Sequence, residues 1–199
     1  MTLKRKNPMI KIAPVLNQYT HTTADRWRWR APTGADTQDI VDLALVCFGP
    51  ETETFFRNDP VEYGRNIMLT TVSQFYNPLT ELLMVAYDGD MLLGYTWARR
   101  GERAAWSTEE MVSIKMAHVR LDLSDRERIT LLAQMIQMWE IWARACKIDV
   151  IFSSTIRESQ DPFLRLHERA GYTVRGSCAY KRLNVVSIDP NTGHIDRPK

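Results

Sequence analysis

Cysteine is scarce in this 199-residue chain, which holds only three. They stand at Cys47, Cys146 and Cys178, an odd number with wide spacing and no Cys-x-x-Cys pair. Disulfide-stabilised secreted domains and zinc modules need paired or closely spaced cysteines. The sequence therefore predicts a protein of a reducing compartment, with a cytoplasmic location and no metal site.

Long apolar runs are also missing, and none reaches the ~20 residues of a membrane-spanning helix. No apolar stretch follows the N-terminal lysines, so a secretory leader is not expected. The 26 basic and 24 acidic side chains nearly cancel, which gives no general basis for binding nucleic acid or membrane. The run Arg26–Arg30 alternates arginine with tryptophan, a pattern that could stack on nucleic acid. A half-buried strand explains the alternation equally well, and we expect no nucleic-acid or membrane partner.

Several catalytic motifs are absent as well. The chain has no Gly-x-Ser-x-Gly elbow, no His-Glu-x-x-His pair and no P-loop, which argues against the enzyme classes that these motifs mark. Its length favours one domain with terminal extensions. Because the ends lack hydrophobic periodicity, we expect a basic arm over 1–26, an α/β domain over 27–185 and a tail over 186–199.

Between the ends, strand and helix patterns alternate. Residues 26–31 alternate charged and aromatic side chains, as a half-buried strand does. A helix follows from about residue 36, and Gly49-Pro50 is expected to end it. A second helix is expected over 60–76, with its apolar side chains turned inward: Val61, Met68, Val72, Phe75 and Tyr76.

The middle of the chain predicts a hairpin and a long strand. Asp88-Gly89-Asp90 separates two apolar runs, 82–87 and 91–98, and an Asp-Gly pair in this setting is a strong hairpin signal. Strict alternation in the next strand, over 111–121, would place five side chains on one face: Val112, Ile114, Met116, His118 and Arg120.

The last third predicts a β-α-β order. Ser124-Asp125-Arg126-Glu127 has the pattern of a capping box that opens a helix running to about Ala145. A buried strand follows over 148–152, then a helix that begins at Asp161-Pro162 and ends at Gly171, and a final strand over 172–183. The whole order predicts an α/β (α+β) domain with a mixed, mainly antiparallel sheet and helices on both faces.

Four of these stretches, taken in order, resemble the GNAT (Gcn5-related N-acetyltransferase) superfamily. They are an opening strand and helix, the hairpin, the end of the central helix and the last helix, namely Trp29–Pro32 with Asp36–Ala44, Met84–Tyr95, Glu140–Arg144 and Phe163–Tyr172. The resemblance covers roughly residues 27–184. It implies a GNAT-like fold and acetyl transfer from acetyl-CoA to an amine of a small molecule or a protein.

In that family the pyrophosphate of acetyl-CoA rests on the N-terminus of the central helix, over a glycine-rich loop. The resemblance places the cofactor against Leu121, Arg126, Arg128, Ile129 and Thr130. This segment has no glycine, and Asp125 and Glu127 bring negative charge to the expected phosphate position. Arg126 and Arg128 could still clamp a phosphate. The alternative, which these residues favour, is a helix that caps itself and binds nothing.

The family's general acid, usually a tyrosine four residues before a glycine, corresponds to His167, and histidine can deliver a proton to a thiolate. A packed, hydrogen-bonded core histidine is the more common outcome on such an apolar helix face. The family's general base is usually a glutamate near the central strands. Candidates here are Glu110 at the start of the 111–121 strand and His118 near its end, although solvation is the simpler interpretation of Glu110.

Two functions therefore remain open. The first is an N-acetyltransferase whose amine substrate the sequence does not identify. The second is a catalytically silent assembly protein that keeps the fold, has lost the cofactor and binds protein partners through its terminal arms, for example within a virus particle. The glycine-free loop and the two long ends motivate the second.

Overall fold

The computed structural model describes residues 27–52, 56–157, 160–176, 187–188 and 195–196. Five strands form one sheet in the order β1-β2-β3-β4-β5, antiparallel throughout except for the parallel pair β4 and β5. The predicted mixed sheet and element order are confirmed as far as α5. The elements of this domain are β1 (Arg28–Arg30), the 3₁₀ turn η3 (Gly34–Asp36), α2 (Thr37–Thr52), α3 (Pro60–Tyr76), β2 (Glu81–Asp88), β3 (Met91–Arg103), β4 (Glu110–Val119), α4 (Asp125–Cys146), β5 (Val150–Phe152) and α5 (Asp161–Arg169).

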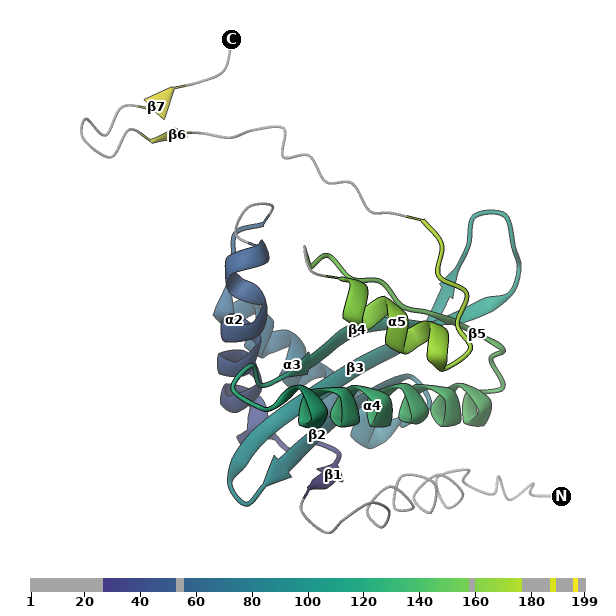
Figure 1. Ribbon diagram of the computed structural model, residues 1–199, viewed down its shortest axis with the longest axis horizontal. Helices are drawn as coiled ribbons and strands as arrows, with labels where there is room; N and C mark the ends of the chain where they lie inside the picture. Colours follow the sequence, from purple (N-terminus) through teal and green to yellow (C-terminus); the bar gives the residue numbers. More distant parts are fainter. Residues whose placement is uncertain (1–26, 53–55, 158–159, 177–186, 189–194, 197–199) are drawn as a thin grey trace, which may run out of the picture.

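Helices cover both faces of this sheet, as expected (Figure 1). α4 packs on one face, where it forms the larger hydrophobic core with the central strands. α5 lies beside α4, and its His167 ring contacts Trp139 of that helix. α2 and α3 pack on the other face, over a second core built on β2 and β3.

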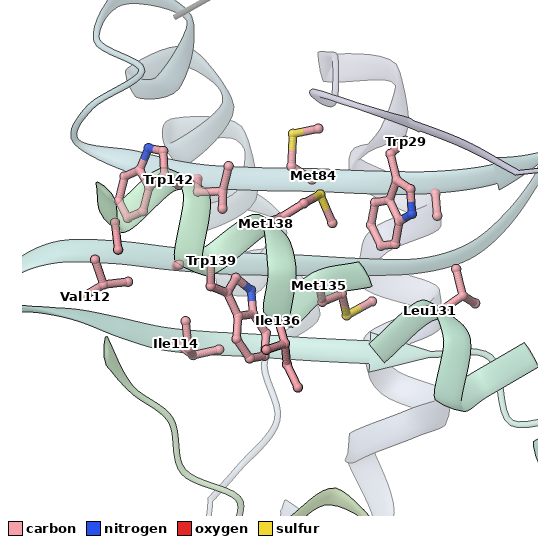
Figure 2. Close-up of a cluster of buried hydrophobic side chains, with 14 of the residues drawn as sticks. Trp29, Met84, Val112, Ile114, Leu131, Met135, Ile136, Met138, Trp139 and Trp142 are labelled. Atoms are coloured by element: carbon pink, nitrogen blue, oxygen red, sulfur yellow. The ribbon is translucent and has the colours of Figure 1, made fainter. Parts of the chain in front are cut away.

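The larger core is centred on the long helix α4 (Figure 2). Trp139 is fully buried there, and its indole N–H donates to the Thr96 hydroxyl at 2.7 Å. Pairing the indole nitrogen removes the cost of burying an unsatisfied donor. Other side chains of α4 in this core are Leu131, Met135, Ile136, Met138, Trp142, Ala143 and Cys146.

The hairpin has the predicted turn, with Gly89-Asp90 between β2 and β3. Gly89 has a φ of 58°, in the left-handed region that glycine adopts without strain.

α2 does not end at Gly49-Pro50, so the expected stop was wrong. The helix continues to Thr52. Near its end the Gly49 carbonyl accepts hydrogen bonds from the Thr52 hydroxyl at 3.2 Å and from the Asn58 amide at 3.1 Å. These side-chain donors serve a carbonyl in the last turn of the helix, where carbonyls have no donor within the helix.

α3 has the predicted bounds but faces the opposite way. Its buried side chains are Ile67, Thr70 and Gln74, and Gln74 bonds both backbone groups of Leu83 in β2. All five side chains predicted to be inward are exposed, from Met68 at 42% to Val61 at 83%, the others being Val72, Phe75 and Tyr76. A polar contact to the sheet backbone therefore overrides the apolar pattern in orienting this helix.

β4 contains a β-bulge that the sequence pattern did not indicate. Ile114 pairs with Ala98 and Met116 pairs with Trp97, so Lys115 is an extra residue between them. A bulge of this kind moves every later side chain to the opposite face. Val112 and Ile114 join the α4 core, whereas Met116 packs against the α2–α3 core and His118 contacts Tyr95 of that core. The predicted single face for these residues was wrong for this reason.

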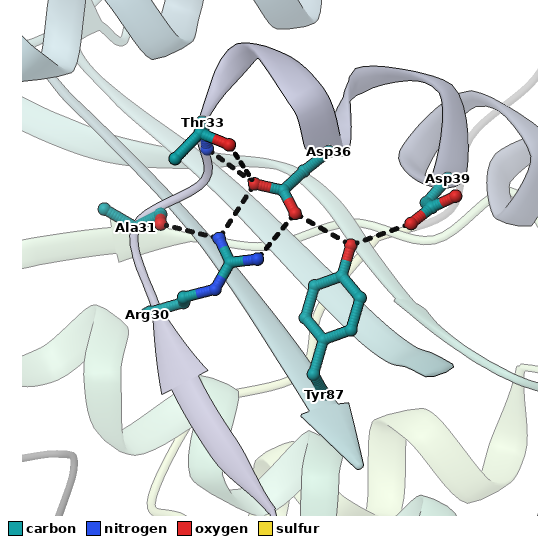
Figure 3. Close-up of polar contacts among 6 residues, drawn as sticks. All are labelled: Arg30, Ala31, Thr33, Asp36, Asp39 and Tyr87. Carbon is teal, nitrogen blue, oxygen red and sulfur yellow. Dashed lines mark hydrogen bonds and ion pairs between the residues drawn. The ribbon is translucent and has the colours of Figure 1, made fainter. Parts of the chain in front are cut away.

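A buried carboxylate connects β1 to the start of α2 (Figure 3). Asp36 accepts two hydrogen bonds from the Arg30 guanidinium, at 2.8 and 2.6 Å, and a third from the Tyr87 hydroxyl at 2.9 Å. The Thr33 backbone N–H and hydroxyl also donate to it, at 2.6 and 2.8 Å. The bonds from Arg30 hold the pKa of this carboxyl well below its usual range.

Asp36→Asn is expected to lower the free energy of unfolding by about 1–3 kcal/mol at pH 7, because the amide cannot accept all of these donors. Partial exposure of Arg30 screens the pair and argues against a larger loss. Since the folded-state pKa is depressed, the stabilisation is present above the unfolded pKa of about 3.9 and is lost as the pH falls below it. Urea unfolding at pH 7 and pH 3 measures both effects. Asp90→Asn, in the exposed β2–β3 turn, is the control, and an equal loss in both variants would contradict the assignment.

The expected arm over 1–26 lies outside the described residues, and so does most of the expected strand over 172–183. Residues 172–176 are described and form no strand, so the predicted strand start at Tyr172 was wrong. β6 (Ser187–Ile188) and β7 (Ile195–Asp196) pair antiparallel within the expected tail. In the described part of the chain, no helix has the length and apolar character needed to cross a membrane.

Candidate functional site

β4 and β5 diverge after a short parallel ladder. They pair only at Met111–Val150, Val112–Ile151 and Ser113–Phe152, although β4 continues to Val119. A cavity of about 380 Å³ lies beyond the last pair, and we call it the β4–β5 cavity. The walls of the cavity are residues 113–118 of β4, Glu102, Phe152, residues 154–157 and Phe163.

A second cavity, of about 230 Å³, lies under α2 and α3. This α2–α3 cavity is bounded by the inner side of α2, by residues 57–60 and by Glu62, Tyr63 and Asn66 of α3. Met116 and His118 of β4 line both cavities. The two cavities therefore share a histidine and a methionine in their walls.

His118 is buried, with 5% of its surface exposed, and it is hydrogen-bonded through Nδ1. That nitrogen lies 2.7 Å from the Tyr95 hydroxyl, and the Tyr95 hydroxyl lies 2.7 Å from the Tyr63 hydroxyl. Burial, together with the charge of Arg157, lowers the pKa of His118 to about 3. His118 is therefore neutral at physiological pH, the protonation state that a general base requires.

Arg157 closes one side of the β4–β5 cavity and connects it to α2. Its guanidinium donates to the Cys47 carbonyl at 2.7 Å. The Cys47 thiol donates to the Val119 carbonyl at 3.1 Å, and burial raises the pKa of this thiol, so it stays protonated. A protonated thiol is a poor nucleophile and a poor metal ligand.

His167, the other candidate histidine, is packed into the core with 3% of its surface exposed. Its Nδ1 lies 2.9 Å from the Phe163 carbonyl, and its Nε2 lies 3.1 Å from the Ser153 hydroxyl. Rings of Phe163, Tyr172 and Trp139 surround it. Both nitrogens are thus engaged by the protein, and the imidazole is not among the groups lining the β4–β5 cavity.

Glu110 lies at the opposite end of β4 from His118. Its carboxylate accepts two hydrogen bonds from Arg100, at 2.6 and 2.8 Å, and these bonds lower its pKa. Arg100 thus holds both oxygens of this carboxylate, and the structure does not bring it together with His118. Among the described residues, no group of three His, Cys, Asp or Glu side chains could hold a metal ion.

The start of α4 caps itself, so the predicted capping box is confirmed. The Ser124 hydroxyl accepts from the Glu127 backbone N–H at 3.4 Å, and the Glu127 carboxylate accepts from the Ser124 backbone N–H at 3.0 Å. Arg128 forms an ion pair with Asp125, and Arg126 is exposed. The Thr130 hydroxyl donates to the Arg126 carbonyl at 2.8 Å, while Leu121 and Ile129 are exposed at 45% and 50%.

These residues do not fit a pyrophosphate. A phosphate at a helix N-terminus needs free backbone donors and a close approach to the backbone, whereas here the Ser124 hydroxyl occupies one donor and Asp125 and Glu127 are negative. Leu121 also lines a neighbouring cavity of about 480 Å³, which contains four carboxylates, those of Asp39, Asp42, Asp90 and Asp122. The one arginine in this cavity, Arg120, forms an ion pair with Asp122. Of the five predicted cofactor contacts, Leu121 is the one that lines this acidic cavity.

Several residues of this site were not indicated by the sequence. Tyr63 and Tyr95 lie 32 positions apart, and Arg157 comes from the segment after β5, so no local spacing connects them with His118. A buried tyrosine usually has a partner for its hydroxyl. That rule could have indicated that Tyr63 and Tyr95 each have a hydrogen-bond partner, but it does not say which residue the partner is.

Comparisons by sequence find no match, either to a family model or to a curated protein. Comparisons by structure find many. A transcriptional regulator from Bacillus halodurans C-125 is 14% identical, with a TM-score of 0.61 over 79% of this chain and 99% of its own. The aminoglycoside 6'-N-acetyltransferase AAC(6')-Iy, in complex with CoA, is 10% identical, with a TM-score of 0.59 over 81% and 97%. Glucosamine-6-phosphate N-acetyltransferase from Arabidopsis thaliana is 8% identical, with a TM-score of 0.56 over 80% and 100%. At these identities the likeness concerns the fold, and the chain has the fold of the GNAT acetyltransferases.

Proposed function

We propose that this protein is an acyltransferase that transfers an acyl group from a thioester to an amine, with His118 as general base. The observation that supports the proposal is the meeting of two cavities at one buried, neutral histidine. The AAC(6') and glucosamine-6-phosphate enzymes of the same fold are acetyltransferases by name. Holding two substrates next to one catalytic group makes their reaction effectively unimolecular.

The β4–β5 cavity is the proposed compartment for the acyl donor. Beyond Ser113, β4 continues without a partner in β5, and an extended, amide-containing arm placed along this edge would add to the sheet like a strand. An acyl thioester bound there would supply an electrophilic carbonyl carbon next to His118. The misfit at the α4 N-terminus indicates that recognition rests on the arm and the acyl group, with little help from the phosphates.

The α2–α3 cavity is the proposed compartment for the amine. An amine is mostly protonated at neutral pH, so one proton must leave before the nitrogen can attack. His118 takes that proton. The C–N bond then forms, the C–S bond breaks, and the second proton of the nitrogen accompanies the departing sulfur. His118 lines both cavities, and this position suits transfer of the acyl group from the donor in one cavity to the amine in the other.

The donor preference tests this proposal. We expect acetyl-CoA and S-acetylpantetheine, which lacks the pyrophosphate and nucleotide, to be used with kcat/KM values within about tenfold, or about 1.4 kcal/mol. The rate of thiol release with a panel of primary amines gives kcat/KM for each of the two donors. Mass spectrometry of the acylated product confirms the transfer. A preference for acetyl-CoA of more than a hundredfold would contradict the arm-based recognition. Failure of every thioester to acylate any amine, or to stabilise the protein against heat, would contradict the function itself.

A matched variant sharpens that comparison. Glu127→Gln removes one negative charge from the α4 N-terminus and weakens the capping box, at a cost of about 1 kcal/mol in stability. Use of acetyl-CoA should improve while use of S-acetylpantetheine stays unchanged, because only the former brings phosphates.

The second candidate function, a silent assembly protein, draws on the self-capped helix. Its terminal arms lie outside the described residues except for β6 and β7. An inactive, monodisperse monomer in solution would count against it.

A further inference from the structure

α3 carries a stripe of apolar side chains on its outer side. The helix packs inward through Ile67, Thr70 and Gln74, and each member of the stripe has at least 42% of its surface exposed. Surface helices normally turn their apolar side toward the core. A contiguous apolar surface turned outward instead marks an interaction site. We call this surface the α3 stripe, and its members are Val61, Met68, Leu69, Val72, Phe75 and Tyr76.

The spacing of the stripe is typical of a helix that pairs with another helix. Val61, Met68 and Phe75 follow one another at intervals of seven residues. Arg65 and Val72 lie between them at the positions that complete a heptad seam, in which side chains of one helix insert between those of a facing helix. α3 has 17 residues and is therefore about 25 Å long. The seam runs along nearly the whole of this length.

The exposed area is close to what one partner of a stable complex buries. The six side chains, two of them aromatic, together expose on the order of 600 Å². Each partner of a standard interface buries about 800 Å². Phe75 and Tyr76 contact each other edge to face, with 5.2 Å between their ring centroids. Because this contact already restricts both rings, less side-chain freedom is lost when a partner binds.

We propose that the α3 stripe is the interface of a homodimer. In this dimer, α3 of one copy packs antiparallel against α3 of a second copy, about a two-fold axis that passes close to Met68 and Leu69. Such an interface uses the same surface on both copies. The proposal does not depend on the proposed function. Tyr63 and Asn66, which line the α2–α3 cavity, do not belong to the stripe.

The two ends of the stripe complement each other, and this property favours a second copy as the partner. The N-terminal end has the small Val61 and the cationic Arg65, whereas the C-terminal end has the bulky Phe75 and Tyr76. Antiparallel pairing places Val61 against the second copy's Tyr76, so a small side chain meets a large one. It also places the Arg65 guanidinium beside the aromatic end, where ring faces attract a cation. Parallel pairing would instead bring two Arg65 side chains together, and like charges in an interface are costly.

The charge of α3 argues against a membrane surface as the partner. Helices that lie in a membrane interface usually carry several lysines or arginines on their polar face. The charged side chains of α3 are Glu62 and Arg65, which form an ion pair with each other. This pair gives the helix no net charge and no attraction for anionic lipid.

The oligomeric state of the full chain tests the proposal. Sedimentation equilibrium should show a monomer–dimer equilibrium with a Kd in the micromolar range, as expected for an interface slightly smaller than the standard one. Leu69→Glu places two carboxylates next to the two-fold axis and should raise the Kd at least about 100-fold. Ile129→Glu makes a matched change at an exposed position of α4 and should leave the Kd unchanged. Circular dichroism checks that both variants fold, and Phe75→Ser replaces Leu69→Glu if the latter does not.

Cysteine cross-linking tests the antiparallel arrangement. With a short bismaleimide reagent, Leu69→Cys should form a cross-linked dimer, because the two copies of this position lie next to the axis. Val61→Cys should not cross-link to itself, since its two copies lie about 20 Å apart along the paired helices. A mixture of Val61→Cys and Tyr76→Cys should cross-link. Wild-type protein, treated in the same way, controls for the native cysteines.

Three results would overturn the homodimer: wild-type protein that stays monomeric at about 200 µM, well above the expected Kd, a dimer that persists in both Leu69→Glu and Phe75→Ser, or efficient cross-linking of Val61→Cys to itself. Vesicles that contain phosphatidylserine provide a further comparison. A monomeric wild-type protein that binds these vesicles, and loses the binding in Leu69→Glu, would assign the α3 stripe to a membrane surface instead.

Discussion

Replacing His118 with glutamine should reduce acyl transfer by about 10²- to 10⁴-fold, the range attributed to a general base. Glutamine fills a similar volume and can keep a hydrogen bond to Tyr95, but it cannot accept a proton. The loss should appear in kcat, because the cavities that hold the two substrates stay in place. Steady-state kinetics with S-acetylpantetheine and a reactive primary amine measures the effect on the folded protein.

His167→Gln is the matched comparison, since it changes the other buried histidine. We expect a loss of stability and little loss of kcat, because His167 uses both ring nitrogens within the core. The reverse result, with kcat lost in His167→Gln and kept in His118→Gln, would transfer the catalytic role to His167. It would also restore the role that the resemblance implied for that position.

Trp139→Ala should produce the largest loss of stability. Trp139 is fully buried, and truncating a large buried side chain to alanine costs about 3–5 kcal/mol. The change would also leave the Thr96 hydroxyl without its indole partner. For a domain of this size such a loss lowers Tm by roughly 6–20 °C. Chemical unfolding followed by circular dichroism gives the free energy directly.

Trp106→Ala provides the control for that experiment. Trp106 has 90% of its surface exposed, and its removal should change the free energy of unfolding by no more than about 0.5 kcal/mol. Equal effects in the two tryptophan variants would show that burial in the α4 core does not set the stability of the fold.

Much of the fold could be predicted because the signals for it are local. The Asp88-Gly89 turn, the Ser124 capping box and the Asp161-Pro162 helix start each depend on a few adjacent residues, and each was confirmed. The orientation of α3 depends on a distant contact, from Gln74 to the backbone of β2. A side-chain amide that satisfies sheet groups has no signature in the hydrophobic pattern. For that reason the pattern predicted the helix and missed its inward face.

The candidate site could be predicted only in part, for a related reason. The resemblance drew attention to His167, and a titratable side chain near the end of the 111–121 strand drew attention to His118. Which histidine lies between two cavities depends on where β4 and β5 separate, and the partners Tyr63, Tyr95 and Arg157 come from three other segments of the chain. Spacing in the sequence carries no information about contacts of that kind.

The bulge at Lys115 has a consequence for comparing this chain with others. At the bulge, β4 has one residue more than the stretch of β3 that it pairs with, because Lys115 has no partner there. An alignment with a protein whose matching strand is regular must therefore place a one-residue gap opposite Lys115. Without that gap, each residue from Met116 to Val119 is matched with a neighbour from the wrong side of the sheet. The column for His118 would then hold core residues of the other proteins, and the histidine would look like an irregular substitution in a packing position.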